Sequence, residues 1–96
     1  MNIKRVFDKY DDEFLKFERI PETIRRSNRP DLHAFLLLNQ LHPSTTDIIS
    51  SAEHDEIWLE IKPEKLEKSI TEPQIIELIR CGVRYDSEYD SLCMFV

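Results

Sequence analysis

Glycine and cysteine are scarce in this chain, and each scarcity excludes a class of site. The 96 residues include a single glycine, Gly82, whereas phosphate-binding loops need two or more glycines at fixed spacing. The two cysteines, Cys81 and Cys93, are too few for a disulfide scaffold and lack the C-x-x-C spacing of zinc and redox sites. We therefore expect no phosphate-binding loop, and we interpret both cysteines as reduced, buried, small hydrophobic residues.

Long apolar segments are also missing. The longest uninterrupted apolar run, Ala34 to Leu38, has five residues, whereas a membrane-spanning helix needs about 20. Residues 1–10 alternate charged and apolar side chains and lack the apolar stretch and cleavage site of a signal peptide. We expect a soluble, cytoplasmic protein. Its length predicts a single domain over residues 1–96, because so short a chain builds only one core.

A surplus of positive charge, the usual mark of nucleic-acid binding, is absent as well. The net charge is -6, and residues 51–96 carry eleven acidic and five basic side chains whereas residues 1–50 carry eight of each. Non-specific nucleic-acid binding and attachment to anionic membranes both depend on lysine and arginine. The acidic second half instead favours a protein partner with a basic surface.

Catalytic and metal-binding motifs are not found. His33, His42 and His54 do not have the helical spacing with glutamate that zinc hydrolases use, and no nucleophile motif surrounds any serine or cysteine. We therefore predict a non-enzymatic protein without metal or cofactor.

The hydropathy pattern predicts an α+β fold, with a small three-stranded, mainly antiparallel sheet packed against three to four helices. Asn28 is the expected N-cap of one helix, Thr71 and Gln74 form a capping box for another, and Gly82 suits a left-handed helix end. The least defined stretch, residues 43–55, suggests a weak helical turn at Ile48 and Ile49. Helices are predicted at about residues 2–18, 29–41, 63–68 and 72–80, and strands at residues 56–61, 82–86 and 91–96.

The last two strands are predicted to form a hairpin with a four-residue loop. Pairing Asp86 with Ser91 separates the side chains into two faces. The face toward the helices should hold Val83, Tyr85, Leu92, Met94 and Val96, and the opposite face should hold Arg84, Cys93 and Phe95.

An acidic surface around the single tryptophan is the first candidate site. In the strand at 56–61, alternation places Trp58 on the face opposite Ile57 and Leu59. Exposed aromatic residues often anchor protein interfaces. The alternative is that Trp58 is buried beneath residues 43–55 or the N-terminal helix. The predicted partner-binding residues are Trp58, Glu53, Asp55, Glu56 and Glu60.

A cluster of arginines is the second candidate site. Planar guanidinium groups suit phosphate and carboxylate recognition, so the cluster could hold a nucleotide or another small anion. The alternative is that these arginines pair with the chain's own carboxylates. The cluster consists of Arg19, Arg25, Arg26 and Arg29.

The helix at 29–41 carries apolar residues around most of its circumference. Such a helix lies either at the centre of a core or at an interface with another chain. We expect a homodimer or larger oligomer, and a homo-oligomeric interaction protein is a third functional hypothesis.

In size and composition the chain resembles small phage and prophage accessory proteins of the anti-defence type, as a short acidic chain with no enzymatic motif and a hydrophobic final strand. The resemblance rests on no family motif and assigns no residue roles. It implies an inhibitor that acts in the host cytoplasm. The leading hypothesis is therefore a non-catalytic binding module or inhibitor whose acidic surface binds a basic protein.

Overall fold

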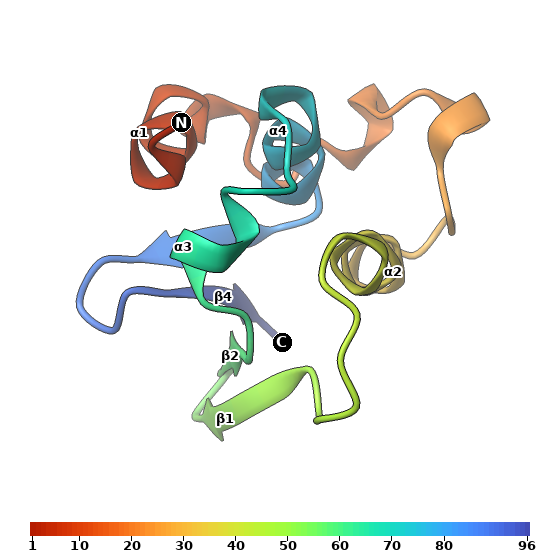
Figure 1. The fold of residues 1–96 in the computed structure, drawn as a ribbon. Helices are drawn as coiled ribbons and strands as arrows, with labels where there is room; N and C mark the ends of the chain where they lie inside the picture. Colours follow the sequence, from red (N-terminus) through yellow and green to blue (C-terminus); the bar gives the residue numbers. More distant parts are fainter.

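A four-stranded antiparallel sheet forms one layer of the fold and the helices form the other (Figure 1). The computed structural model describes residues 1–96. In the sheet, the strands lie in the order β1-β2-β4-β3. The predicted α+β class and antiparallel sheet are confirmed, but the prediction of three strands is wrong. The strands are β1 (Ile49–Glu53), β2 (Glu56–Leu59), β3 (Val83–Asp86) and β4 (Ser91–Phe95).

The additional strand, β1, lies at one edge of the sheet. It pairs with β2 through a two-residue turn closed by Glu53 and Glu56, and His54 in this turn has a φ of 56°. The sequence of β1, Ile-Ser-Ser-Ala-Glu, has no alternation of apolar and polar residues that would indicate a strand. In the structure all five residues are exposed. The helical turn predicted at Ile48 and Ile49 is therefore wrong, because Ile49 begins β1.

Three of the four predicted helices are confirmed to within about two residues. They are α2 (Pro30–Leu41), α3 (Pro63–Leu66) and α4 (Glu72–Arg80). The fourth, expected over residues 2–18, is wrong in length, because α1 (Ile3–Lys9) is followed only by 3₁₀ turns at Asp11–Glu13, Phe17–Arg19 and Glu22–Ile24. Leu15 has a φ of 64°, and its N–H donates to the Ile79 carbonyl of α4 at 3.2 Å. The chain thus leaves the helix to pack along α4.

The helix ends show which of the predicted capping residues are correct. The capping box of Thr71 and Gln74 is present, and Gly82 follows α4 with a φ of 96°. A Cβ at Gly82 would lie 3.0 Å from a side-chain carbon of Leu15. The predicted cap at Asn28 is wrong, because Arg29 occupies the N-cap position of α2 without a side-chain hydrogen bond.

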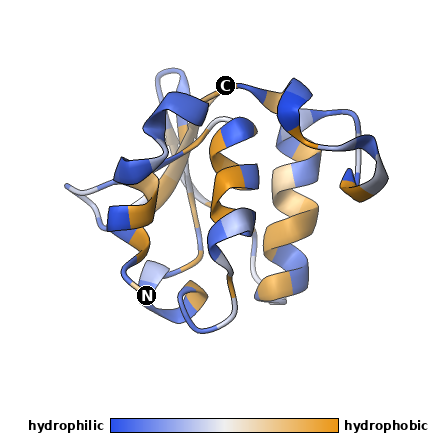
Figure 2. Cartoon of the chain, turned by 90° about the horizontal axis from the view of Figure 1, so that it is seen from above, coloured by the Kyte–Doolittle hydropathy of each residue, from blue (hydrophilic) through white to orange (hydrophobic).

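A single core of 19 buried apolar residues lies between the two layers. Figure 2, seen from the helix side, shows hydrophobic residues recurring along α2, the helix at the right, while the connecting loops are mainly hydrophilic. Of the residues predicted to face the helices, Val83, Leu92 and Met94 are buried and Tyr85 packs against the core. Val96 is 74% exposed, so its predicted inward placement is wrong.

The two cysteines are buried and free, as the sequence predicted. Burial raises the pKa of the Cys81 thiol to about 12 and that of the Cys93 thiol to about 11. A thiol with so high a pKa is a poor nucleophile at neutral pH. Both residues therefore serve as packing groups.

Candidate protein-binding face

One face of the sheet is packed against the helices, and the other, which we call the open face, is not (Figure 1). The strand register places Trp58 of β2 beside Ser51 on one side and Cys93 on the other, with Arg84 next to Cys93. Because side chains alternate along each strand, these residues share a face with their second neighbours. The open face consists of Ser51, Glu53, Glu56, Trp58, Arg84, Asp86, Ser91, Cys93 and Phe95.

Trp58 is partly buried on the open face and is held there by Asp86. The indole N–H of Trp58 donates to Oδ2 of Asp86 at 2.9 Å, and the backbone N–H of Glu88 donates to Oδ1 of Asp86 at 2.9 Å. The pKa of Asp86 lies below its ordinary value, chiefly because of the Trp58 hydrogen bond and then because of backbone hydrogen bonds from Glu88 and Tyr89. One carboxylate thus fixes both the tryptophan and the hairpin loop that follows β3.

This loop brings a second aromatic ring to Trp58. The centroids of the Trp58 and Tyr89 rings are 5.8 Å apart with an interplanar angle of 82°, and Tyr89 is 64% exposed. An edge-to-face pair at this distance is a favourable aromatic arrangement. The two rings border an open hollow of about 300 Å³, which is lined by Ser51, Glu53, Trp58, Tyr89 and Ser91.

The structure therefore brings two of the predicted partner-binding residues, Trp58 and Glu53, into one hollow. Glu60 lies on the other side of the loop, where it lines a second depression with Tyr89 and Ser91. The side chain of Asp55 is exposed in the β1–β2 turn. Trp58 is partly buried, and its neighbours include Ser51 of β1, which belongs to residues 43–55, together with Cys93 and Tyr89.

Glu56 has a different environment from the other predicted acidic residues. Its carboxylate pairs with the guanidinium of Arg84 across the open face. The same guanidinium lies 3.9 Å from the centroid of the Phe95 ring. Glu56 is therefore engaged within the chain, whereas Glu53, Asp55 and Glu60 have no pairing with lysine or arginine.

Sequence reasoning missed Tyr89, Ser51 and Asp86 as members of this site. The predicted hairpin already placed Tyr89 in the loop after Asp86, so its proximity to the sheet could have been inferred. Ser51 gave no comparable signal, because β1 has no alternating pattern.

The arginine cluster is largely engaged with the chain itself. Arg19 pairs with Glu13 at 2.5 Å, and the guanidinium of Arg25 donates to the Ile20 carbonyl at 2.9 Å. Arg26 donates to the Gln40 side chain. Of the four arginines, only Arg29 makes no side-chain hydrogen bond or ion pair. These contacts favour the interpretation in which the cluster pairs with groups of this chain.

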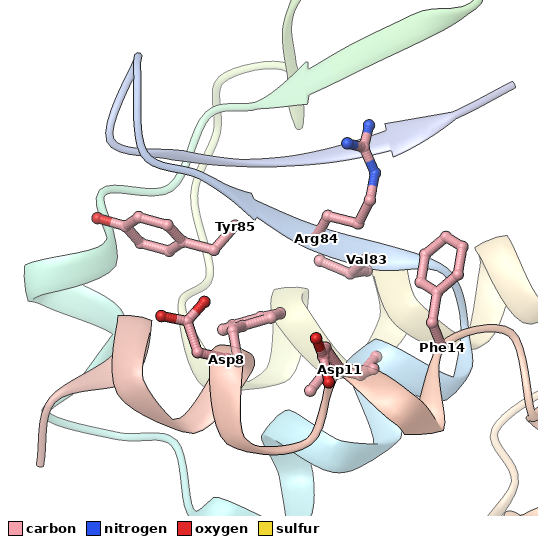
Figure 3. A pocket seen from close by; sticks show the side chains of 8 residues that line it. Asp8, Asp11, Phe14, Val83, Arg84 and Tyr85 are labelled. Carbon is pink, nitrogen blue, oxygen red and sulfur yellow. The ribbon is translucent and has the colours of Figure 1, made fainter.

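A separate hollow of about 250 Å³ lies between α1 and β3 (Figure 3). Asp8 and Asp11 stand at its α1 side, and Phe14 and Tyr85 form part of its walls. None of the predicted site residues lines this hollow.

An apolar groove of about 410 Å³ separates α2 from the end of the sheet. Phe35 of α2 and Ile49, Phe95 and Val96 of the sheet line it. Leu32 and Leu36 lie beside Phe35 on the helix and are 42% and 40% exposed. We call these five residues, Leu32, Leu36, Ile49, Phe95 and Val96, the apolar patch; each of them is at least 40% exposed.

The histidines do not gather with other metal-binding side chains. No group of three or more histidine, cysteine, aspartate or glutamate side chains is positioned to hold a metal ion. His33 is fully buried, where its Nε2 lies 3.0 Å from Oε1 of Glu77 and its Nδ1 accepts from the Arg26 backbone N–H. This histidine links α2 to α4. None of the helices is both long enough and apolar enough to cross a membrane.

Acidification is expected to loosen the Trp58 site. Because the folded-state pKa of Asp86 lies below its unfolded value, near 3.9, its contribution to stability is complete above that value and is lost as the pH falls through the folded-state pKa. We expect the fluorescence of Trp58, the chain's single tryptophan, to change below about pH 4. Asp86→Asn should produce a similar change at neutral pH.

Protonation of Glu13 must be distinguished from protonation of Asp86, because the pKa of Glu13 is also lowered, chiefly by the hydrogen bond from Arg80. Far-UV circular dichroism at each pH monitors the global fold, and Glu13→Gln provides a variant in which that carboxylate no longer titrates. An unchanged Trp58 emission spectrum down to pH 2, with the fold intact, would contradict the role of Asp86.

Comparisons of the chain with models of known protein families, with curated protein sequences and with solved structures found no match. The function is therefore inferred from the geometry of the chain itself.

Proposed function

We propose that this protein is a non-catalytic binding module, or an inhibitor, whose open sheet face binds a basic surface of another protein. The observation that carries the proposal is the position of Trp58 and Tyr89, which form an ordered aromatic pair on a helix-free face beside Glu53 and Glu60. Aromatic residues in partly desolvated positions provide much of the binding energy at protein interfaces.

Charge supports a basic partner. Glu53 and Glu60 are exposed beside the aromatic pair and Asp55 is exposed in the β1–β2 turn. The single basic residue of the open face, Arg84, is engaged by Glu56 and Phe95. Such a face attracts a basic surface and raises the association rate. The resemblance in size and composition to phage accessory proteins suggests an inhibitor of a host protein, acting in the cytoplasm.

Reversing two of these charges is expected to slow association. We choose Glu53→Lys with Glu60→Lys, because both side chains are exposed and neither pairs with a lysine or arginine. Glu56→Lys would instead expel Arg84 from its pair and disturb the sheet. At low salt we expect association at least about tenfold slower than for the wild type, with a weaker dependence on salt, because rim charges act mainly on the association rate.

The test uses the wild type and two variants as baits in a cell lysate. The control variant, Asp12→Lys with Glu22→Lys, has the same net charge as the reversed variant but places its lysines in the 3₁₀ turns. Each protein that the wild type and the control both capture is then studied by surface plasmon resonance with all three baits, and slower association with the reversed variant alone supports the proposal. If every captured protein shows the same association rate with all three baits, the acidic face is not a binding surface.

A homodimer is a second proposal, favoured by the apolar patch. Ile49, Phe95 and Val96 are exposed and line one groove with Phe35 of α2, and Leu32 and Leu36 are exposed on the same helix. Monomeric proteins seldom expose large groups of apolar residues close together. The patch lies at the α2 side of the sheet, so a second copy bound there would leave Tyr89 and the hollow beside it accessible.

A further inference from the structure

We propose that the hollow between Trp58 and Tyr89 is a receptor for one arginine side chain of the basic partner. This inference rests on the proposed function, and it identifies the group that the open face recognises. The hollow, of about 300 Å³, combines two aromatic rings, the carboxylate of Glu53 and the hydroxyls of Ser51 and Ser91.

The aromatic rings provide the first part of the argument. Tryptophan is the strongest of the aromatic side chains in binding cations over its ring. The indole N–H of Trp58 already donates to Asp86, so the ring rather than the N–H is offered to a ligand. Tyr89 stands nearly perpendicular to Trp58, at 82°, and both residues line the hollow, so Tyr89 provides a second aromatic wall.

Two basic side chains of this protein already contact an aromatic ring and a carboxylate together. On the open face, the Arg84 guanidinium lies 3.9 Å from the Phe95 ring centroid and pairs with Glu56. On the helical side, the Lys9 ammonium lies 5.1 Å from the Tyr10 ring centroid and 3.7 Å from a carboxylate oxygen of Glu72.

The Trp58 hollow repeats this combination of aromatic ring and carboxylate without an internal lysine or arginine. Its carboxylate, Glu53, has one ion-pair neighbour, the exposed imidazole of His54 at 3.6 Å. The hollow thus has the components that bind Arg84 and Lys9 elsewhere, and a cation from a partner can occupy it.

Arginine fits the hollow better than lysine. The guanidinium is planar, so it can stack on an aromatic face while its several N–H groups donate in its own plane. Around the hollow, the acceptors are the Glu53 carboxylate and the Ser51 and Ser91 hydroxyl oxygens. Lysine has a compact and strongly hydrated charge, which gains less from a flat aromatic surface.

Fluorescence of Trp58 provides a direct test, because no other tryptophan contributes. The probes are three blocked tripeptides, acetyl-Gly-Arg-Gly-amide, its lysine counterpart and its citrulline counterpart, in which the guanidinium is replaced by a neutral urea. We expect the arginine peptide to change the emission saturably at millimolar concentration, the lysine peptide to bind more weakly, and the citrulline peptide to have no effect at up to about 50 mM.

Two substitutions and one control locate the site. Tyr89→Ser removes one wall and Glu53→Gln removes the carboxylate; both side chains are exposed, so the fold should be retained. Each is expected to weaken arginine-peptide binding by about fivefold or more. Glu22→Gln, on the 3₁₀ turn at Glu22–Ile24, should leave it unchanged.

The proposal is overturned if the arginine peptide leaves the Trp58 emission unchanged, if citrulline or lysine binds as tightly as arginine, or if neither Tyr89→Ser nor Glu53→Gln weakens binding. Its failure can be distinguished from failure of the proposed function. If the reversed variant slows association with a basic partner but the arginine peptide does not bind, the acidic face is a binding surface without an arginine receptor. If the peptide binds but charge reversal affects no partner, the proposed function fails.

Discussion

Replacing Trp58 by alanine is expected to shorten the lifetime of the complex with a basic partner by roughly 30-fold, the equivalent of about 2 kcal/mol. Trp58 is the central aromatic residue of the open face, with Ser51 and Cys93 beside it in the sheet. Truncation removes the ring that excludes water at the centre of the contact. The effect should appear in the dissociation rate, because the surrounding carboxylates, which steer association, are unchanged.

Surface plasmon resonance on the partner identified by the three baits measures both rates. Trp58→Phe is a matched variant that keeps an aromatic ring but loses the hydrogen bond to Asp86, so we expect an intermediate dissociation rate. Thermal unfolding monitored by circular dichroism serves as the control for the fold. If Trp58→Ala unfolds the domain, Trp58 is a core residue; if the folded variant dissociates as slowly as the wild type, Trp58 does not anchor the partner.

The second large effect is expected at the apolar patch. Leu36→Lys should convert a dimer into a monomer of 11.5 kDa, because Leu36 is exposed on α2 and a lysine there would bring a charge into the interface. Burying a leucine is worth about 1.5–3 kcal/mol. In a twofold-symmetric interface each substitution acts twice, so we expect dimer affinity to fall by about a hundredfold or more.

Sedimentation at micromolar concentration measures this change. Ile24→Lys is the control, because Ile24 is 48% exposed but lies in a 3₁₀ turn that is not part of the apolar patch. The control should sediment as the wild type does. A wild-type monomer, or a Leu36→Lys variant that remains dimeric, would contradict the homodimer proposal.

Several structural features that depend on residues close together in the sequence were predicted correctly. The capping box at Thr71 and the left-handed Gly82 were predicted correctly, because each depends on residues within about one helical turn. The pairing of Asp86 with Ser91 was also correct, since the length of a hairpin loop fixes the register of its strands.

Non-local contacts account for the errors. The pattern from Ile3 to Phe17 is apolar at helical spacing, yet the helix ends at Lys9 and Leu15 bonds to Ile79 of α4. A contact with a residue so distant in sequence leaves no periodic signal. β1 was missed for a related reason: its residues are all exposed, and it is a strand because it pairs with β2.

By itself, the sequence determined the α+β class, the three later helices, the C-terminal hairpin and the placement of Trp58 and its acidic neighbours in the second half of the chain. Each of these follows from local periodicity, capping or composition. Only the tertiary structure decided that Asp86 and Tyr89 meet Trp58, that Glu56 is engaged by Arg84 whereas Glu53 lines the hollow, and that Leu36 is exposed. Such relations depend on strand order and side-chain packing, which bring together residues that no local pattern connects.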